Sequence, residues 1–385
     1  MSQEEDVVHD AIERLEWDER KEEDTPFKKA RQLTRRTALT GGAAGIGALI
    51  LQACGGGGSS SSSSTAKAAS GSSSSAASSI FGTSQSYHFV MVNHVTTNVF
   101  FTPTQNGAAD ACKLLGCSYT WTGSATSNVG EMVNAINSAI TGGAAGIATS
   151  LIDPHAFNAP VQKALSQNIP VVAYNADEPS SGRLAYIGQD LFLSGQQMGQ
   201  HIVELLPSGG EIALFIATPG SANIQPRIDG AKDTLKSHPN IKYSVVATGA
   251  AVPAELTVIN SWATGHSSAK GMFAVDAGST QGIAQTIQKQ GLRAKGWKGG
   301  GYDLTPITEQ LLQAGEIDFT IDQQPYLQGF IPILQLYMYK ASQGLTGIAE
   351  TDTGLKFLDK TTIKPYASTK SRYEGTGTSP GVQKA

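Results

Sequence analysis

The chain has 385 residues, a length that favours two or three folded units over one. Hydrophobic residues make up 40% of the sequence, enough for packed cores, whereas charged residues make up only 16%. Residues 54–385 contain 20 Lys or Arg and 21 Asp or Glu, so this part of the chain is nearly neutral. That balance excludes the strongly basic surface on which nucleic-acid binding depends.

The first 54 residues are typical of an export signal. Arg35 and Arg36 precede an uncharged segment at 37–53, which is the twin-arginine pattern, and the segment is too short and glycine-rich for a membrane span. It ends in Leu-Gln-Ala before Cys54, which resembles the lipobox of bacterial lipoproteins. We predict lipidation at Cys54 and a location on the outer face of the cytoplasmic membrane. The alternative is an ordinary signal peptide with a chance cysteine.

A flexible tether is expected at residues 55–85. Residues 55–79 are almost wholly Gly, Ser and Ala, a composition that cannot bury enough apolar surface to fold. A flexible coil of that length spans roughly 25–30 Å on average. It would hold a folded body close to a membrane face while leaving it free to turn.

Short apolar runs alternate with helical patterns from residue 86 onward, which indicates parallel sheets covered by helices on both faces. The first set predicts strands at 87–92, 117–121, 146–148 and 169–173, with helices at 102–115, 128–140 and 154–167. The second set predicts helices at 190–206, 254–262, 278–290 and 326–341, with strands at 211–217, 241–247, 271–275, 299–302 and 317–321. These are too many strands for one small sheet, so we expect two similar α/β lobes followed by a loose tail at 366–385.

Polar and aromatic residues follow the predicted strands, where ligands bind in open α/β sheets. The candidate ligand-binding residues are Asn98, Phe100, Phe101, Asn175, Arg227, Asp276, Asp303 and Gln323. Rings can hold the C–H faces of a neutral polyhydroxylated molecule, while amide, carboxylate and guanidinium groups pair with its hydroxyls. Each buried polar group left unpaired by a wrong ligand costs about 1–3 kcal/mol, which gives such a site its selectivity.

At these loops the sequence resembles the ribose-type periplasmic sugar-binding proteins. The similar segments are Asn98-Val99-Phe100-Phe101, Val171 to Asn175, Ser221 to Gly230, Phe273 to Asp276, Tyr302 to Pro306 and Ile321 to Pro325. Val99 replaces a Pro of the family pattern, and at the ligand positions Asn175 replaces an Asp, Ala176 replaces an Arg, and Asp276 replaces an Asn. The departures at the ligand positions argue against ribose itself.

The resemblance implies a type I periplasmic binding protein: two Rossmann-like lobes with parallel sheets, joined by a three-crossover hinge and closing over a ligand. The lobes would comprise 86–189 with 323–345, and 190–322 with 350–365, with crossovers near 190, near 323 and at 344–349. The implied function is capture of a small neutral sugar or polyol for an ABC-type permease, by a monomer without cofactor. The alternatives are a module that presents the sugar to a membrane receptor and, less favoured, a secreted enzyme.

Structural roles compete with several of these assignments. The Phe100 and Phe101 rings can be core residues, and we expect one in the cleft and one partly packed. Asp276 and Asp303 can cap helices, and Arg227 can form a surface ion pair.

The seven histidines show no zinc-like spacing, and we expect a surface role for His94 and His266. The sequence contains no nucleophile–base motif that would indicate an enzyme. For Cys112 and Cys117, two small buried thiols are favoured over a disulfide.

Overall fold

The computed structural model describes residues 86–374, 377 and 382–384. The predicted export signal, Cys54 and the predicted tether at 55–85 therefore lie outside the described residues. No helix in the described part of the chain has both the length and the apolar character of a membrane span.

The first sheet contains six strands in the order β11-β5-β4-β3-β1-β2, and every neighbouring pair is parallel. Its strands are β1 (His88–Asn93), β2 (Ser118–Gly123), β3 (Gly146–Thr149), β4 (Val171–Tyr174), β5 (Tyr186–Gly188) and β11 (Thr351–Asp352). Its helices are α4 (Thr102–Leu115), α5 (Val129–Thr141), α6 (Asn158–Ser166) and α12 (Leu327–Ala341), with short 3-10 turns η1 (Val99–Phe101) and η2 (Pro179–Ser181). We call this unit the N-terminal lobe.

The second sheet repeats the plan, in the order β12-β10-β9-β8-β6-β7. Its strands are β6 (Gly210–Ile216), β7 (Ile241–Ala247), β8 (Gly271–Ala274), β9 (Lys298–Tyr302), β10 (Phe319–Asp322) and β12 (Lys356–Leu358), of which only β12 is antiparallel to its neighbour. Its helices are α7 (Leu191–Leu205), α8 (Gln225–Leu235), α9 (Val252–Gly265), α10 (Ala277–Gln290), α11 (Pro306–Ala314) and the 3-10 turn η3 (Leu292–Lys295). We call this unit the C-terminal lobe. The prediction of two parallel α/β lobes is confirmed.

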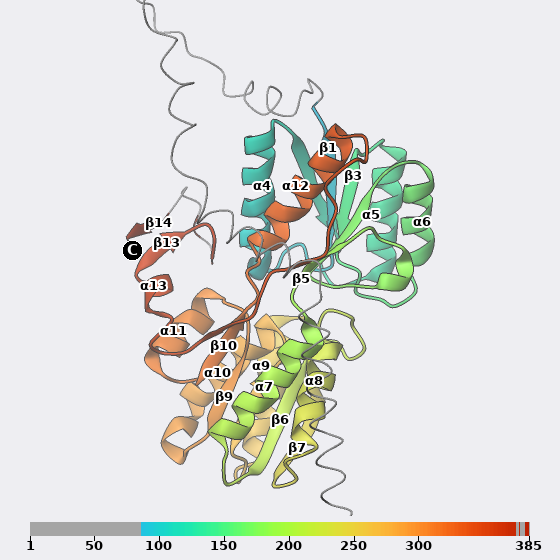
Figure 1. Cartoon of the computed structure of the whole chain (residues 1–385). Coiled ribbons are helices and arrows are strands. Elements are labelled where there is room, and N and C mark those ends of the chain that lie inside the picture. The colour runs from blue at the N-terminus through green and yellow to red at the C-terminus, as the bar shows by residue number, and fades with distance from the viewer. Residues whose placement is uncertain (1–85, 375–376, 378–381, 385) are drawn as a thin grey trace, which may run out of the picture. The chain divides into compact units, whose positions relative to one another are not determined.

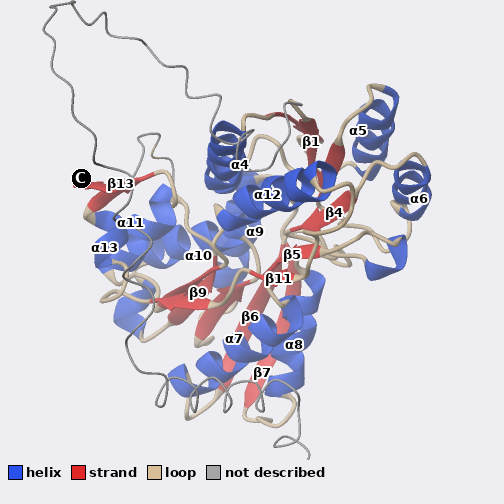
Figure 2. Ribbon diagram, turned by 45° about the horizontal axis from the view of Figure 1, so that its top comes forward, coloured by secondary structure: helices blue, strands red, loops and turns tan. Residues whose placement is uncertain are grey.

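Alternation along the strands places a core on each face of each sheet. In β1, Phe89 and Met91 pack toward α4 and α12, whereas Val90 and Val92 pack toward α5 and α6. Figure 2 shows these two helix pairs on opposite sides of the first sheet. The four buried clusters, two in each lobe, hold the strand ends in fixed positions.

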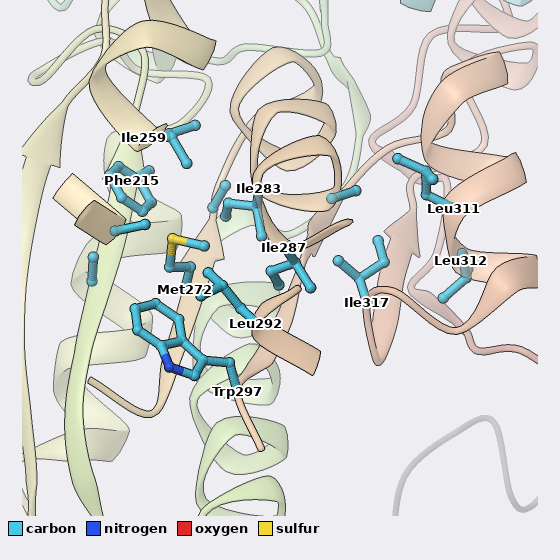
Figure 3. Packing of buried hydrophobic residues seen from close by; sticks show 14 of the residues in the cluster. Phe215, Ile259, Met272, Ile283, Ile287, Leu292, Trp297, Leu311, Leu312 and Ile317 are labelled. Carbon is cyan, nitrogen blue, oxygen red and sulfur yellow. The ribbon is translucent and has the colours of Figure 1, made fainter. Parts of the chain in front are cut away.

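The C-terminal lobe core under α9, α10 and α11 shows the same principle in detail. Phe215 and Met272 project from neighbouring strands onto Ile283 and Ile287 of α10, and Trp297 closes one end of the cluster (Figure 3). The Trp262 ring also belongs to this cluster. This core supports the loops that follow β8 and β9.

The chain passes between the sheets three times (Figure 1): after β5 at 189–190, after β10 at 323–326, and between β11 and β12 at 353–355. The first two positions match the expected crossovers, whereas the third lies beyond the expected 344–349. The two strands that flank it are only two and three residues long, and neither carries an apolar run that a sequence pattern can detect.

The segment after residue 363 differs from the expected loose tail. It forms α13 (Lys364–Ala367) and β13 (Thr369–Ser371), which pairs with β14 (Val382–Lys384). Tyr366 packs against the C-terminal lobe core, while the Tyr373 ring meets Tyr326 of the N-terminal lobe edge-on at 4.8 Å. The segment therefore contacts both lobes.

The end of α4 brings the two described cysteines together. Gly116 adopts φ 69°, a left-handed conformation that ends the helix, and Cys117 N–H donates to the Cys112 carbonyl at 3.0 Å. Both cysteines are free thiols, Cys112 buried and Cys117 half-buried.

Candidate functional site

The carboxyl ends of the two sheets carry the candidate residues, and contacts join them across the lobes. Asn175 follows β4, and its Nδ2 donates to Gln323 Oε1 at 3.3 Å. Gln323 lies in the second crossover, and its Nε2 donates to Asp303 Oδ1 at 2.7 Å. One hydrogen-bonded chain therefore runs from Asn175 in the N-terminal lobe through Gln323 to Asp303 in the C-terminal lobe.

Two of these residues hold strained backbone conformations. Asn175 has φ 64° and Asp303 has φ 73°, in the left-handed region that ordinary side chains rarely adopt. Non-glycine residues in this region cluster at functional sites, where packing maintains the strain. Asp303 does not cap α11, because Thr305 does so instead. The capping alternative for Asp303 is therefore wrong.

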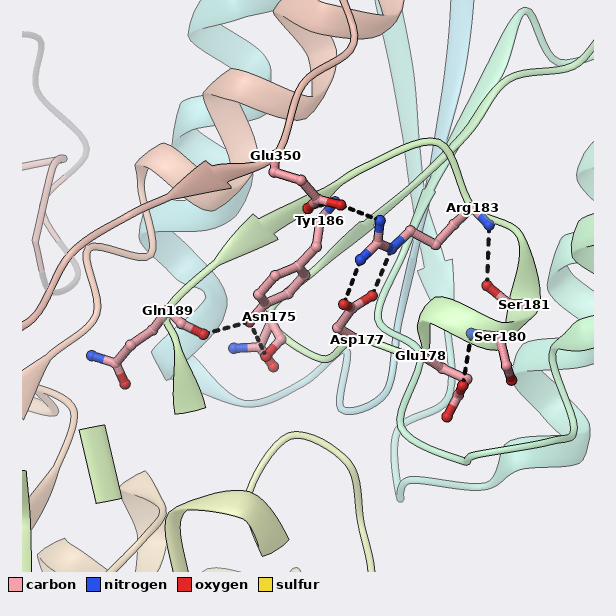
Figure 4. A network of polar contacts seen from close by, with 9 residues as sticks. All are labelled: Asn175, Asp177, Glu178, Ser180, Ser181, Arg183, Tyr186, Gln189 and Glu350. Carbon is pink, nitrogen blue, oxygen red and sulfur yellow. Dashed lines mark hydrogen bonds and ion pairs between the residues drawn. The ribbon is translucent and has the colours of Figure 1, made fainter. Parts of the chain in front are cut away.

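A polar network fixes the loop that carries Asn175 (Figure 4). Tyr186 O–H lies 3.2 Å from the Asn175 carbonyl and 3.1 Å from the Gln189 carbonyl, both of which can accept from it. Arg183 donates to both oxygens of Asp177, at 2.7 and 2.6 Å, and also pairs with Glu350 ahead of the third crossover. The hinge and the Asn175 loop are thus positioned together.

Arg227 is buried at 2% exposure on α8 and makes no ion pair within the described residues. Its Nη1 donates to the Val275 carbonyl at 2.9 Å, and its Nη2 donates to Gln189 Oε1 at 3.3 Å. The guanidinium lies over the Tyr302 ring, 4.1 Å from its centre. A surface ion pair, the structural alternative for Arg227, is therefore wrong.

Asp276 caps α10, as its structural alternative proposed. Its Oδ1 accepts from Ser279 N–H at 2.8 Å, and its Oδ2 accepts from Ala217 N–H at 2.9 Å. Burial raises the pKa of Asp276, although these two donors oppose that change. Burial also raises the pKa of Asp303 to about 7, despite the opposing charge of Arg227. The C-terminal lobe therefore places two perturbed carboxyl groups and one guanidinium at its strand ends.

The aromatic candidates lie at the N-terminal lobe's strand ends. Asn98 caps η1 by accepting from Phe100 N–H at 3.0 Å. Phe100 and Phe101 are both buried and meet edge-on at 4.8 Å. Phe101 is the ring that contacts the other strand-end groups, at 5.2 Å from His94 and 6.1 Å from Trp121.

His94 corrects the expectation of a surface histidine, because it is buried and joins the lobes. Its Nδ1 pairs with Ser150 Oγ at 2.9 Å, and its Nε2 faces Asn223 Nδ2 of the other lobe at 3.2 Å. An amide nitrogen can only donate, so Nε2 accepts and Nδ1 carries the proton. Burial lowers the pKa of His94 to about 4. A second link lies beside it, since Ala222 N–H donates to the Ile152 carbonyl at 2.9 Å.

Buried polar atoms without a hydrogen-bond partner among the described residues include Asn93 Nδ2, Thr149 Oγ1 and Asn175 Oδ1 at strand ends, and Arg227 Nε on α8. Asn93 ends β1 and was missed by sequence reasoning, although it directly follows the apolar run at 87–92. Its Oδ1 accepts from the Tyr174 hydroxyl at 2.9 Å, which leaves the Nδ2 side unpaired. Because an unsatisfied buried polar group costs about 1–3 kcal/mol, such a group calls for a binding partner.

No group of three or more His, Cys, Asp or Glu side chains in the described ranges is arranged to hold a metal ion. Ser150 and His94 pair at these strand ends, but His94 Nδ1 carries the proton and donates to the Ser150 hydroxyl, so this nitrogen cannot take a proton from it. Hydrogen bonding is the chemistry that the strand-end groups offer.

The comparisons with known proteins agree with this architecture. A family model described as a periplasmic binding protein domain matches residues 89–344. The chain belongs to that family.

One curated relative, the xylose/arabinose-binding protein XylF of Sulfolobus acidocaldarius, is 52% identical over 307 residues, which covers 76% of each chain. A solved ABC transporter solute-binding protein from Burkholderia graminis, in complex with D-arabinose, has a TM-score of 0.70 at 24% identity, covering 74% of this chain and 99% of that one. A carbohydrate transporter structure from Acidothermus cellulolyticus, in complex with myo-inositol, has a TM-score of 0.66 at 23% identity, covering 74% and 97%. The two solved structures share the fold of this chain.

Proposed function

We propose that this protein is an extracytoplasmic solute-binding protein that captures a neutral pentose between its lobes and delivers it to an ABC-type permease. The observation that carries the proposal is the set of unpartnered buried atoms at the strand ends and on α8, which includes donors on Asn93 and Arg227 and an acceptor on Asn175. A sugar hydroxyl donates and accepts at once, so one class of ligand satisfies all three.

The choice of a pentose rests on the xylose/arabinose-binding relative, whose identity of 52% extends over most of both chains. The buried rings of Phe100 and Phe101 support a sugar ring, because aromatic faces pack against C–H surfaces. The links from His94 to Asn223 and from Ile152 to Ala222 support a form in which the lobes meet.

The experiment is a thermal-shift screen of neutral sugars and polyols, with D-xylose and L-arabinose first and their aldonic acids as charged comparisons. At a hundredfold excess over the dissociation constant, a ligand stabilises the folded state by about 2.7 kcal/mol. We expect a neutral pentose to raise the melting temperature of the protein and the corresponding aldonic acid to leave it unchanged. A shift with the acids alone would contradict the proposal.

Attachment to the membrane through lipid on Cys54 completes the proposal. It rests on the Leu-Gln-Ala-Cys sequence and the Gly/Ser-rich segment that follows. Cys54→Ser should move the exported protein from the membrane fraction to the soluble fraction without changing sugar affinity. Retention of the variant in the membrane fraction would contradict the anchor and leave the sugar site unaffected.

A further inference from the structure

Glu255 is a buried carboxyl group beside the proposed sugar site. It lies in the first turn of α9 and is only 2% exposed. No donor among the described residues reaches its Oε2. A buried carboxyl without a donor is costly as an anion, so this position requires another explanation.

Gly278 shows where the Glu255 carboxyl lies. A Cβ added at residue 278 would stand 1.8 Å from Glu255 Oε2 and 2.7 Å from Oε1, so only glycine leaves room for the carboxyl. Gly278 lies in the first turn of α10, two residues after the Asp276 cap. Glu255 therefore approaches the N-terminus of α10 beside Asp276.

Asp276 acts on Glu255 both as a neighbouring charge and as a hydrogen-bond partner. Two buried anions this near each other repel strongly, so we expect the two carboxyl groups to share one proton. Asp276 already accepts from two backbone N–H groups and lies within the field of Arg227, which favours its ionised form. Among the described residues, Glu255 has neither backbone N–H donors nor a nearby positive charge to stabilise its anion. Burial first, and Asp276 second, raise the pKa of Glu255 to about 9. The proton therefore belongs on Glu255 at neutral pH.

We infer that Glu255 is a positioning residue of the sugar site: its protonated carboxyl donates to the Asp276 carboxylate and directs the remaining lone pair of Asp276 toward a ligand hydroxyl. This inference rests on the proposed function. The charged groups that act on the pair are Arg227 from α8, which favours the anion at Asp276, and Asp303 from the loop after β9, whose pKa is raised in part by repulsion from Asp276. A carboxyl donor gives Asp276 a pH-dependent orientation that a fixed amide would not.

The test compares Glu255→Gln and Glu255→Ala with wild type, by calorimetric titration with the best pentose from pH 6 to pH 10. Wild-type affinity should fall above about pH 9, because ionised Glu255 repels Asp276. Glutamine keeps a donor at every pH, so Glu255→Gln should bind within about threefold of wild type at pH 7 and should lose the decline at high pH. Glu255→Ala should bind roughly 10- to 100-fold more weakly at pH 7, as expected for a lost hydrogen bond to a charged group.

Glu131→Gln is the matched control, because Glu131 also lies in the first turn of its helix but is exposed in the other lobe. It should behave as wild type at every pH. Melting curves of the unliganded variants separate a folding defect from a binding defect. Wild-type binding that neither change at residue 255 alters would overturn this inference alone. Absence of pentose binding by wild type would overturn the proposed function, and this inference with it.

Discussion

The two lobes bring different chemistry to the same site. The N-terminal lobe offers rings and amides, and its one buried histidine, His94, has a pKa lowered to about 4. The C-terminal lobe offers a guanidinium on Arg227 and carboxyl groups on Asp276 and Asp303 whose pKa values are raised. We call the rings, amides and neutral His94 of the N-terminal lobe the neutral wall of the proposed site. Arg227, Asp276 and Asp303 of the C-terminal lobe form its ionisable wall. We therefore expect shape recognition to depend on the N-terminal lobe and pH dependence on the C-terminal lobe, so that substitutions in the two lobes should have different effects.

The largest expected effect concerns Asp303 and the stability of the unliganded protein. Because its pKa is raised to about 7, the protonated form is favoured on folding, and its contribution is complete below the unfolded value near 4. That contribution is lost as the pH rises from about 4 through 7, on the order of 2–4 kcal/mol. Asp303→Asn should remove this part of the pH dependence, measured by denaturant unfolding at several pH values. An unchanged dependence of the unfolding free energy on pH would mean that a group other than Asp303 titrates in this range.

Arg227→Lys comes next and probes the ionisable wall directly. Lysine keeps the charge but not the planar fork that donates to Val275 and Gln189, so pentose affinity should fall about 100-fold. Arg293→Lys is the control, because Arg293 pairs with Asp318 elsewhere in the same lobe. Equal losses in both variants would mean that the effect is one of lobe stability.

Phe101→Leu tests the neutral wall. Loss of the ring removes its edge contact with His94, its tilted contact with Trp121 and the packing against the sugar that we propose, so affinity should fall roughly tenfold with no change in pH profile. Calorimetry at pH 6 and pH 8 measures both. Phe330→Leu, a half-buried ring on α12, serves as the comparison. If pentose affinity depended on pH differently in Phe101→Leu than in wild type, the neutral wall would also contribute to the pH dependence, contrary to our expectation.

The smallest effect is expected at the link between the lobes. Asn223→Ala removes the hydrogen bond to His94 and should weaken pentose binding about threefold, mainly through faster release. Stopped-flow dissociation kinetics measure this change. An unaltered release rate would show that the link does not contribute to the sugar-bound form.

The sequence was most informative where one physical rule acts. Parallel strands end at a common edge, so the apolar runs alone placed Asn175 and Asp303 at the strand ends where the structure has them. The contacts among them required the structure. Gln323 joins those two residues from a crossover, and His94 reaches Asn223 across 129 positions of sequence. Pairings between residues so far apart in the sequence leave no signal in a local hydrophobic pattern, so the sequence alone does not predict them.

Other features were missed for related reasons. Glu255 follows ordinary helical spacing, and only the space beside Gly278 reveals its role. The segment after α13 carries few apolar residues, yet Arg372 pairs with Asp110 at 2.9 Å and Tyr373 packs on Tyr326. Long-range polar and ring contacts of this kind order a segment whose composition alone suggests a tail.

A crystal structure of the protein with a bound pentose would show directly whether the sugar lies between the lobes. We predict that it does, with one face against Phe101 and its hydroxyls within hydrogen-bond distance of Asn175 Oδ1 and Arg227 Nε. A pentose bound to one lobe alone, or to an outer face away from these residues, would contradict it.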